Sequence, residues 1–267
     1  DNLADAKNDY TYSNLFIGNV PQNLNTNGSY PTIDGRGNLS IGKDALNDIT
    51  TGRSNLAIGA KSLNKLTEGF GNTSIGKNSL EDNTTGHNNV AIGQDALKNN
   101  LTGVDNLGIG NDVLSHNTSG QKNVSIGDWA LGWNNDDYNV AIGFTSGRND
   151  VNLGQASGVK KSILIGMGVK PHSNSENQIV IGHEAASMGN NTAVLGNDNI
   201  DSTFLKGKID IDGAYVFPVT AGNAGEVLTY PASGNELQWG SASGGANSID
   251  DLSDALLNTS KNNLFLG

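Results

Sequence analysis

Cysteine is absent from the 267 residues, which excludes disulfides, thiolate metal sites and cysteine nucleophiles. Charged residues are sparse, at 16%, against about 25% in a typical soluble domain. No apolar run approaches the roughly 18 to 20 residues of a membrane-spanning helix, and no basic-then-apolar leader opens the chain. Basic residues, 16 against 27 acidic ones, leave a net charge of −11. We therefore expect neither nucleic-acid binding nor membrane insertion.

What the chain does have is glycine (36 residues) and asparagine, both placed at a fixed period. The pair Ile-Gly recurs every 17 residues, with a last interval of 16. An Asn stands three positions before each of these Ile residues, and a Leu stands five positions after the first six. The seven copies begin at Ile41, Ile58, Ile75, Ile92, Ile109, Ile126 and Ile142. A fixed period of this kind predicts a stacked repeat architecture.

The repeat unit predicts short strands. In residues 89–93, Val90 and Ile92 are two positions apart and share one strand face, while Ala91 points to the other face. The position of Ala91 holds only Ser, Ala or Gly in all seven units, which indicates close packing. We expect each unit to be one rung of a β-solenoid with two short strands and two turns, with the Ile side chains buried. Asn would then lie over Asn at about 4.8 Å per rung.

The expected fold class is therefore all-β, a β-solenoid. One rung supplies only about three to five apolar side chains, and their burial offsets little of the conformational entropy that is lost when the rung becomes ordered. For this reason we expect an intertwined parallel homotrimer, in which three chains fill a core together. The partner predicted first is thus the chain itself.

The period divides the chain into five expected segments. After residue 143 the Ile-Gly and Leu-Gly pairs become irregular, and from about residue 201 the pattern changes to alternating strands with Trp239 in a small core. Residues 250–267 repeat the pattern of residues 1–18, as expected for one module cut from a longer fibre. The segments are an N-terminal connector with the first rung (1–37), regular rungs (38–147), shorter irregular rungs (148–200), a small β module (201–245) and the start of a further unit (246–267).

The repeat Asn-x-Ala-Ile-Gly-x-x-Ala-Leu-x-x-Asn-Thr-Thr-Gly, approximated at residues 72–86 and 89–103, resembles repeats of phage tail fibres and bacterial fibrous adhesins. It is also similar to the heads of trimeric autotransporter adhesins, although their rungs are shorter than 17 residues, so strand details are not transferred. Residues 213–239 resemble a module that often follows such repeats. The resemblance implies an elongated homotrimeric fibre, extracellular, on a virion tail or a bacterial surface. Its implied partner is a glycan or envelope protein on the surface of a host or prey cell.

No catalytic, cofactor or metal site is predicted. The four His residues lack zinc-ligand spacing, and no nucleophile elbow or phosphate-binding glycine loop occurs. The possible receptor contacts are aromatic residues at two irregular places, where exposed rings suit carbohydrate stacking or partner anchoring. They are Trp129, Trp133, Tyr138 and Phe144 near the end of the regular rungs, and Tyr30 in the long stretch before Ile41. The alternative is that these rings cap the rungs or wedge between the chains of a trimer.

Two other function classes stay open. A polysaccharide-cleaving tailspike would need a carboxylate pair, for which the chain offers Asp136 with Asp137, Asp210 with Asp212, and Asp250 with Asp251. A monomeric solenoid that binds an ordered surface such as ice would need a flat Thr ladder. Thr50, Thr67, Thr84 and Thr118 approach such a ladder, but Leu101 interrupts it.

Overall fold

The computed structural model describes residues 6–9, 13–18, 35–149, 152, 154–205, 210–211, 215–216, 222–224, 226–229 and 237–241. The chain divides into two compact units, Asp1–Ile200 and Asp201–Gly267. All regular secondary structure in the described residues is β, without any helix. Each unit is considered by itself below.

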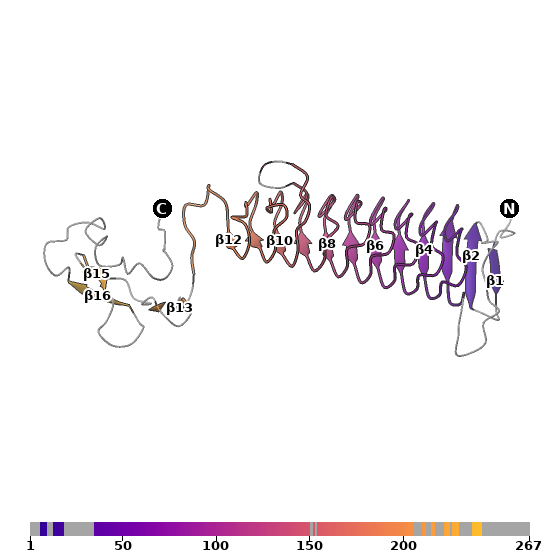
Figure 1. Cartoon of the computed structure of the whole chain (residues 1–267), viewed down its shortest axis with the longest axis horizontal. Helices are drawn as coiled ribbons and strands as arrows, with labels where there is room; N and C mark the ends of the chain where they lie inside the picture. The colour runs from indigo at the N-terminus through magenta and orange to yellow at the C-terminus, as the bar shows by residue number, and fades with distance from the viewer. Residues whose placement is uncertain are drawn as a thin grey trace. The chain divides into compact units, whose positions relative to one another are not determined.

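The first unit is a β-solenoid built on one 12-stranded sheet whose strand order follows the chain (Figure 1). Strands β2 to β12 are parallel, and β1 pairs antiparallel with β2 at the amino-terminal end. The strands are β1 (Ala6–Asp9), β2 (Asn14–Gly18), β3 (Leu39–Gly42), β4 (Leu56–Ile58), β5 (Thr73–Ile75), β6 (Val90–Ile92), β7 (Leu107–Ile109), β8 (Val124–Ile126), β9 (Val140–Ile142), β10 (Ile163–Ile165), β11 (Ile179–Ile181) and β12 (Ala193–Leu195). The predicted solenoid with 17-residue rungs is confirmed.

Each described rung contains one short strand, and the prediction of two strands per rung was wrong. Rung-to-rung hydrogen bonds continue outside the strand, for example from Leu97 N–H to the carbonyl of Val113 (2.9 Å). There, however, Leu97 has φ +50° and Asp95 has φ +54°. Left-handed residues interrupt the extended backbone that a strand requires. The residues that follow the strand, such as 94–99 in the β6 rung, therefore form a stack of turns, which we call the turn wall.

The face of each strand that points into the rung is the opposite of the one predicted. Ala57, Ala91 and Ala141, at the strand centres, are fully buried, whereas Ile41 and Ile142 are 37% and 38% exposed. A rung of 17 residues encloses a narrow space, so the strand can send only a small side chain inward. The large inward side chain is a leucine from the turn wall, fully buried in six rungs: Leu46, Leu63, Leu80, Leu97, Leu114 and Leu131. One chain closes each rung, so a core shared by three intertwined chains is not required for burial.

Buried asparagines link the rungs along the axis, as the sequence predicted. The side-chain oxygen of Asn89 accepts the backbone N–H (3.0 Å) and the side-chain amide (3.1 Å) of Asn106 on the next rung. The amide of Asn89 donates to the carbonyl of Gly103 at 2.8 Å. The ladder runs through Asn14, Asn38, Asn55, Asn72, Asn89, Asn106, Asn123 and Asn139, all buried. Buried amides with partners on both sides fix the register of each rung.

The second unit contains two antiparallel strand pairs among its described residues. β13 (Asp210–Ile211) pairs with β14 (Tyr215–Val216), and β15 (Glu226–Thr229) pairs with β16 (Gln238–Ser241). Trp239 lies opposite Leu228 and packs so closely on Gly222 that a β-carbon there would stand 2.5 Å from the indole ring.

Candidate functional site: an apolar sheet face and its two edges

The outward side of the long sheet carries two continuous columns of apolar side chains, which we call the outer face. Parallel pairing in register stacks them, as in Val90 beside Leu107 and Ile92 beside Ile109. Thr73 is the only polar member. One column is Leu15, Leu39, Leu56, Thr73, Val90, Leu107, Val124, Val140, Ile163, Ile179 and Ala193; the other is Ile17, Ile41, Ile58, Ile75, Ile92, Ile109, Ile126, Ile142, Ile165, Ile181 and Leu195.

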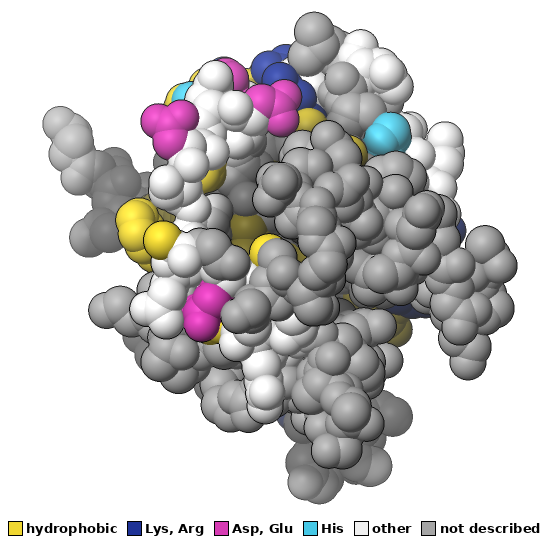
Figure 2. Space-filling view, turned by 90° about the vertical axis from the view of Figure 1, so that its left-hand side faces the viewer, with side chains coloured by type: hydrophobic (Ala, Val, Ile, Leu, Met, Phe, Trp, Pro, Cys, Tyr) yellow, Lys and Arg dark blue, Asp and Glu magenta, His cyan; other side chains and the backbone are white. Residues whose placement is uncertain are grey.

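The outer face is an extended apolar surface. Strands about 4.8 Å apart make it roughly 48 Å long and two side chains wide, on the order of 500 Å². None of its residues is buried. The largest contiguous apolar patch of a typical soluble monomer is about 300 to 600 Å² and often has a function, so the outer face has the size of an interaction surface. Exposure is also high at the carboxyl-terminal end of the solenoid, at Met188 (79%) and Leu195 (58%). The space-filling view shows further hydrophobic side chains at the surface among polar ones (Figure 2).

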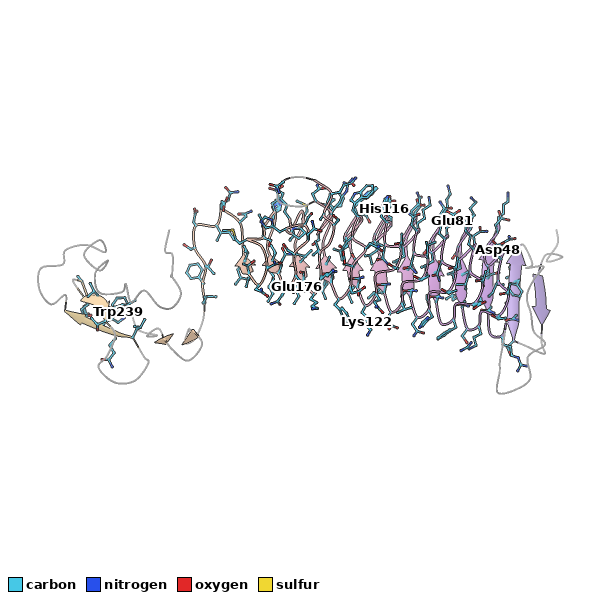
Figure 3. The ribbon with its side chains drawn as sticks, viewed as in Figure 1. Asp48, Glu81, His116, Lys122, Glu176 and Trp239 are labelled. Carbon is cyan, nitrogen blue, oxygen red and sulfur yellow. The ribbon has the colours of Figure 1, made fainter. Side chains whose placement is uncertain are left out.

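Charged side chains lie outside the two columns of the outer face. Asp48, Glu81 and His116 lie along one side of the ribbon, and Lys122 and Glu176 along the other (Figure 3). Ion pairs link neighbouring rungs on the turn wall, including Lys61–Glu81 (3.2 Å) and Lys65–Asp82 (2.7 Å). These side chains are partly exposed, and such pairs contribute only about 0 to 1 kcal/mol each.

The strands end along two lines that border the outer face. Because the strands are parallel, residues two positions before each strand line one border, the amino edge, and residues two positions after each strand line the other, the carboxyl edge. Tyr138 precedes β9 on the amino edge and Phe144 follows β9 on the carboxyl edge. Both are well exposed, at 49% and 55%.

The two tryptophans predicted as receptor contacts lie elsewhere, on the turn wall after β8. Both are half-buried. The ring of Trp133 lies against His116 of the preceding rung, with centroids 3.7 Å apart, and the guanidinium of Arg148 lies 4.3 Å over the ring of Trp129. The structure thus separates the predicted set into a tryptophan pair and two sheet-edge residues, and Tyr30 lies outside the described residues.

The partners His116 and Arg148 were missed by sequence reasoning. The 17-residue period places His116 one rung before Trp133 (positions 116 and 133), so that contact could have been predicted. Arg148 could not, because the period fails directly after it: Asn149 and Gln155 form an isolated antiparallel bridge at the base of an insertion.

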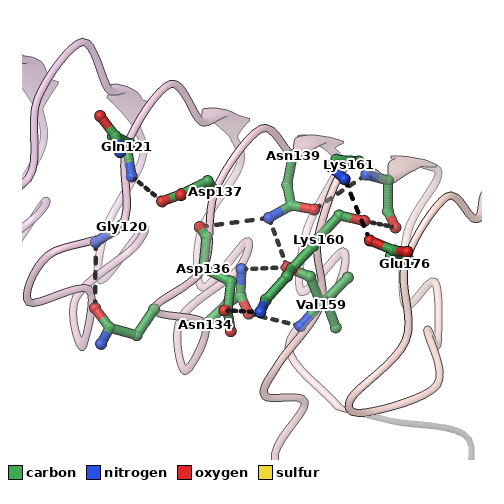
Figure 4. Close-up of polar contacts among 12 residues, drawn as sticks. Gly120, Gln121, Asn134, Asp136, Asp137, Asn139, Val159, Lys160, Lys161 and Glu176 are labelled. Carbon is green, nitrogen blue, oxygen red and sulfur yellow. Dashed lines mark hydrogen bonds and ion pairs between the residues drawn. The ribbon is translucent and has the colours of Figure 1, made fainter.

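The change from regular to irregular rungs is held by polar contacts (Figure 4). Asn134 and Val159 bond reciprocally, side-chain amide to carbonyl and backbone N–H to side-chain oxygen, both at 3.1 Å. Asn139 also donates to the carbonyl of Val159, at 2.7 Å. The chain therefore rejoins the ladder after the insertion, and the sheet continues from β9 to β10 without a break.

Carboxylates on the turn wall have shifted pKa values. Burial is the largest influence on Asp112 and raises its pKa, and the charge of Asp95 on the preceding rung raises it further. Burial also acts to raise the pKa of Asp95, but hydrogen bonds from Asn78, Gln94 and Lys98 outweigh it and hold that pKa below its usual value. The hydrogen bond and charge of Asp82 raise the pKa of Lys65.

The carboxylate pairs considered for catalysis serve other contacts where they are described. Asp136 forms an ion pair with Lys160 (3.3 Å), and Asp137 accepts the backbone N–H of Gln121 (2.8 Å). Asp210 is described only as part of β13, and the other candidates (Asp212, Asp250 and Asp251) lie outside the described residues.

The threonine ladder is engaged within the solenoid. The hydroxyls of Thr50, Thr67 and Thr84 each donate to a carbonyl of the next rung, at 3.0 to 3.1 Å. They act as rung-to-rung bonds, and Leu101 takes the next place in the column.

Within the described part of the chain, no three His, Asp or Glu residues are grouped so that they could hold a metal ion. The described residues also include no helix with the length and hydropathy to span a membrane. Comparison with family models, characterised proteins and solved structures gives no match to this chain.

Proposed function

We propose that this chain is a segment of an extracellular homotrimeric fibre, on a virion tail or a bacterial surface, that presents a recognition surface to a glycan or envelope protein of another cell. The observation that carries the proposal is the outer face. Three copies arranged around an axis parallel to the solenoid would turn their outer faces inward and bury them together. Burial of apolar surface contributes about 25 cal/mol per Å², so this patch can drive association.

The arrangement also fits a role as a spacer. The interior of each chain is already filled by its own leucines, alanines and asparagines. Association would therefore join three closed solenoids along one additional, intermolecular core. Rung-to-rung hydrogen bonds run the full length of the regular part, which suits an element that holds a recognition surface at a distance.

The oligomeric state tests the assembly. Light scattering on a sizing column should give three times the 27.7 kDa of one chain. Ile92→Asp places a charge on the outer face and should yield a folded monomer with an unchanged circular dichroism spectrum. Thr102→Asp, at an exposed site elsewhere on the rung, is the matched control and should remain trimeric. A monomeric parent chain, or a trimeric Ile92→Asp, would contradict the proposal.

Recognition is tested separately, on the half-buried tryptophan pair. Binding of the trimer to glycan arrays and to cells should decrease in Trp133→Ala while the mass stays that of a trimer. His116→Ala removes the ring against which Trp133 lies and should reduce binding less. Binding that is unchanged in both variants would remove this pair from the recognition surface.

A further inference from the structure

The two edges of the outer face carry complementary side chains at the same height. In the β8 rung, Lys122 lies on the amino edge and Asp128 on the carboxyl edge; in the β9 rung these places hold Tyr138 and Phe144. All four are exposed. Opposite charges thus face outward from two sides of one rung, and aromatic rings from two sides of the next.

These pairs cannot form within one chain. Lys122 and Asp128 are six positions apart across the strand, a span of up to roughly 20 Å at 3.3 Å per residue. Within the chain, each has another neighbour: the ammonium group of Lys122 lies 5.3 Å from the ring centroid of Tyr138, and Asp128 accepts the backbone N–H of Asn111 at 2.8 Å. These contacts hold both side chains at their edges.

We propose that the carboxyl edge of one copy docks on the amino edge of the next, with Asp128 against Lys122 and Phe144 against Tyr138. The inference rests on the proposed homotrimer and specifies its geometry. In a ring of parallel copies around an axis along the solenoid, the two edges of neighbouring copies meet at equal height, because cyclic symmetry relates them by rotation alone. Tyr138 and Phe144 are then contacts between chains rather than receptor contacts.

The edges also discriminate against a shift of one rung. Moving one copy in one direction would place Asp128 against Asp105, the amino-edge residue of the β7 rung, and like charges repel. Moving it in the other direction would place Lys122 against Asn111 and leave the charge of Asp128 against Tyr138. Only the unshifted arrangement satisfies both the ionic and the aromatic pair.

Cross-linking tests the proposal directly, because the natural chain has no cysteine. A chain carrying Tyr138→Cys and Phe144→Cys is treated, as the intact assembly, with a bismaleimide linker shorter than the roughly 14 Å that separates three rungs. Denaturing gels should show a closed covalent trimer. The matched control pairs Tyr138→Cys with Gln94→Cys, which lies on the same carboxyl edge three rungs away, and should stay monomeric on the gel.

The outcomes separate this inference from the proposed function. A sample that scatters light as a trimer but gives no cross-link at positions 138 and 144, or an equal one at positions 138 and 94, overturns the edge pairing and leaves the trimer intact. A sample that is monomeric before cross-linking overturns both.

Charge reversal supplies a second readout. Lys122→Glu and Asp128→Lys should each raise the concentration of half-assembly several-fold in a dilution series by analytical ultracentrifugation. The double variant should return it toward that of the parent. Asp128→Lys also loses the bond to Asn111, but the double variant loses it as well, so recovery reports the pair between chains. Additive weakening in the double variant would contradict the proposal.

Discussion

In the long rungs, from β3 to β8, the strand contributes a small side chain to the interior and the turn wall contributes a leucine. In the short rungs, from β10 to β12, the strand centre itself carries the large side chain, at Leu164, Val180 and Val194. The rung of β9 marks the change: it combines the small Ala141 with Gly147, where the leucine of the turn wall would stand. The side chain of Leu164 fills that place, because a β-carbon on Gly147 would lie 2.7 Å from its Cδ1.

The comparison between long and short rungs indicates that the interior of each rung is filled to a similar degree, although the large side chain comes from different positions. Close-packed interiors tolerate a redistribution of side-chain volume better than a net change. The same exchange occurs on a smaller scale inside the regular part. Val113 takes a turn-wall position that is Ala or Ser in the other long rungs, and the strand of that rung has Gly108 at its centre. A β-carbon on Gly108 would lie 3.2 Å from Cγ1 of Val113.

The largest expected effect comes from changing how the interior of the β9 rung is filled, from Leu164 of the next strand to a leucine at position 147 of the turn wall. Gly147→Leu should destabilise the solenoid by about 3 kcal/mol, because the new side chain overlaps Leu164. Leu164→Ala alone should cost about 2 to 5 kcal/mol through the cavity that it leaves. The double variant should recover most of both losses, since it recreates the arrangement of a long rung, where leucines with φ near +50° are tolerated. Urea titrations measure the coupling, and strictly additive losses would contradict volume conservation.

The ladder comes next in expected effect. Asn89→Ala should destabilise the protein by about 2 kcal/mol, because it leaves the backbone N–H of Asn106 buried without an acceptor, whereas the carbonyl of Gly103 keeps the amide of Asn100 as a donor. Asn99→Ala, at a half-buried position on the turn wall of the same rung, should change stability by no more than about 0.5 kcal/mol. Thermal melts of the two variants measure the difference. Equal losses would mean that the asparagine ladder does not bear on stability more than a surface amide.

Much of the fold could be predicted from sequence because each repeated position has one structural task. Stacking in register follows from the constant period. The hydrogen bonds between buried Asn side chains follow because an Asn occupies the same position in every repeat, from Asn38 to Asn139. The orientation of the strand could not be obtained from alternation alone, since Val90 and Ile92 define a face without saying which side is inside. The informative signal was the restriction of the central position to Ser, Ala or Gly, because only a narrow interior requires small residues there.

The candidate site was less predictable for a related reason. Aromatic residues near the end of the period were visible in sequence, but their grouping was not. Tyr138 and Phe144 lie on opposite edges because β9 separates them, and Trp129 meets Arg148 only because an insertion begins there. Positions relative to a strand decide which neighbours a side chain has, and those positions depend on which three residues of the rung form the strand.

A smaller effect tests the exchange inside the regular part. Gly108→Ala should destabilise the solenoid by about 1 to 2 kcal/mol, because its methyl group meets Val113 and Leu97 at 3.2 to 3.3 Å. Val113→Ala should remove the first of these contacts and restore part of the stability in the double variant. Ala91→Gly, at the same position of the preceding rung, is the control for backbone entropy. A double variant no more stable than the sum of the single changes predicts would contradict the exchange of volume between the two positions.

The smallest expected effect lies outside the interior, at Asp95 and Asp112 on neighbouring rungs of the turn wall. There the repulsion between two carboxylates, rather than packing, affects stability. The pKa of Asp112 is raised above the usual 3.8 by burial and by Asp95, so the folded state binds its proton more tightly than the unfolded state. Stability from this group is therefore present below pH 3.8 and is lost as the pH rises through the raised pKa. Asp112→Asn should stabilise the protein by about 0.5 kcal/mol at pH 7 and change little at pH 3. Asn78 occupies the same column with φ +55°, so the backbone tolerates the change.

Asp105→Asn is the control and should give no stabilisation, because Asp105 accepts a hydrogen bond from Asn88 (3.2 Å). Melting temperatures at the two pH values decide, and a gain of equal size at both would exclude charge as its cause.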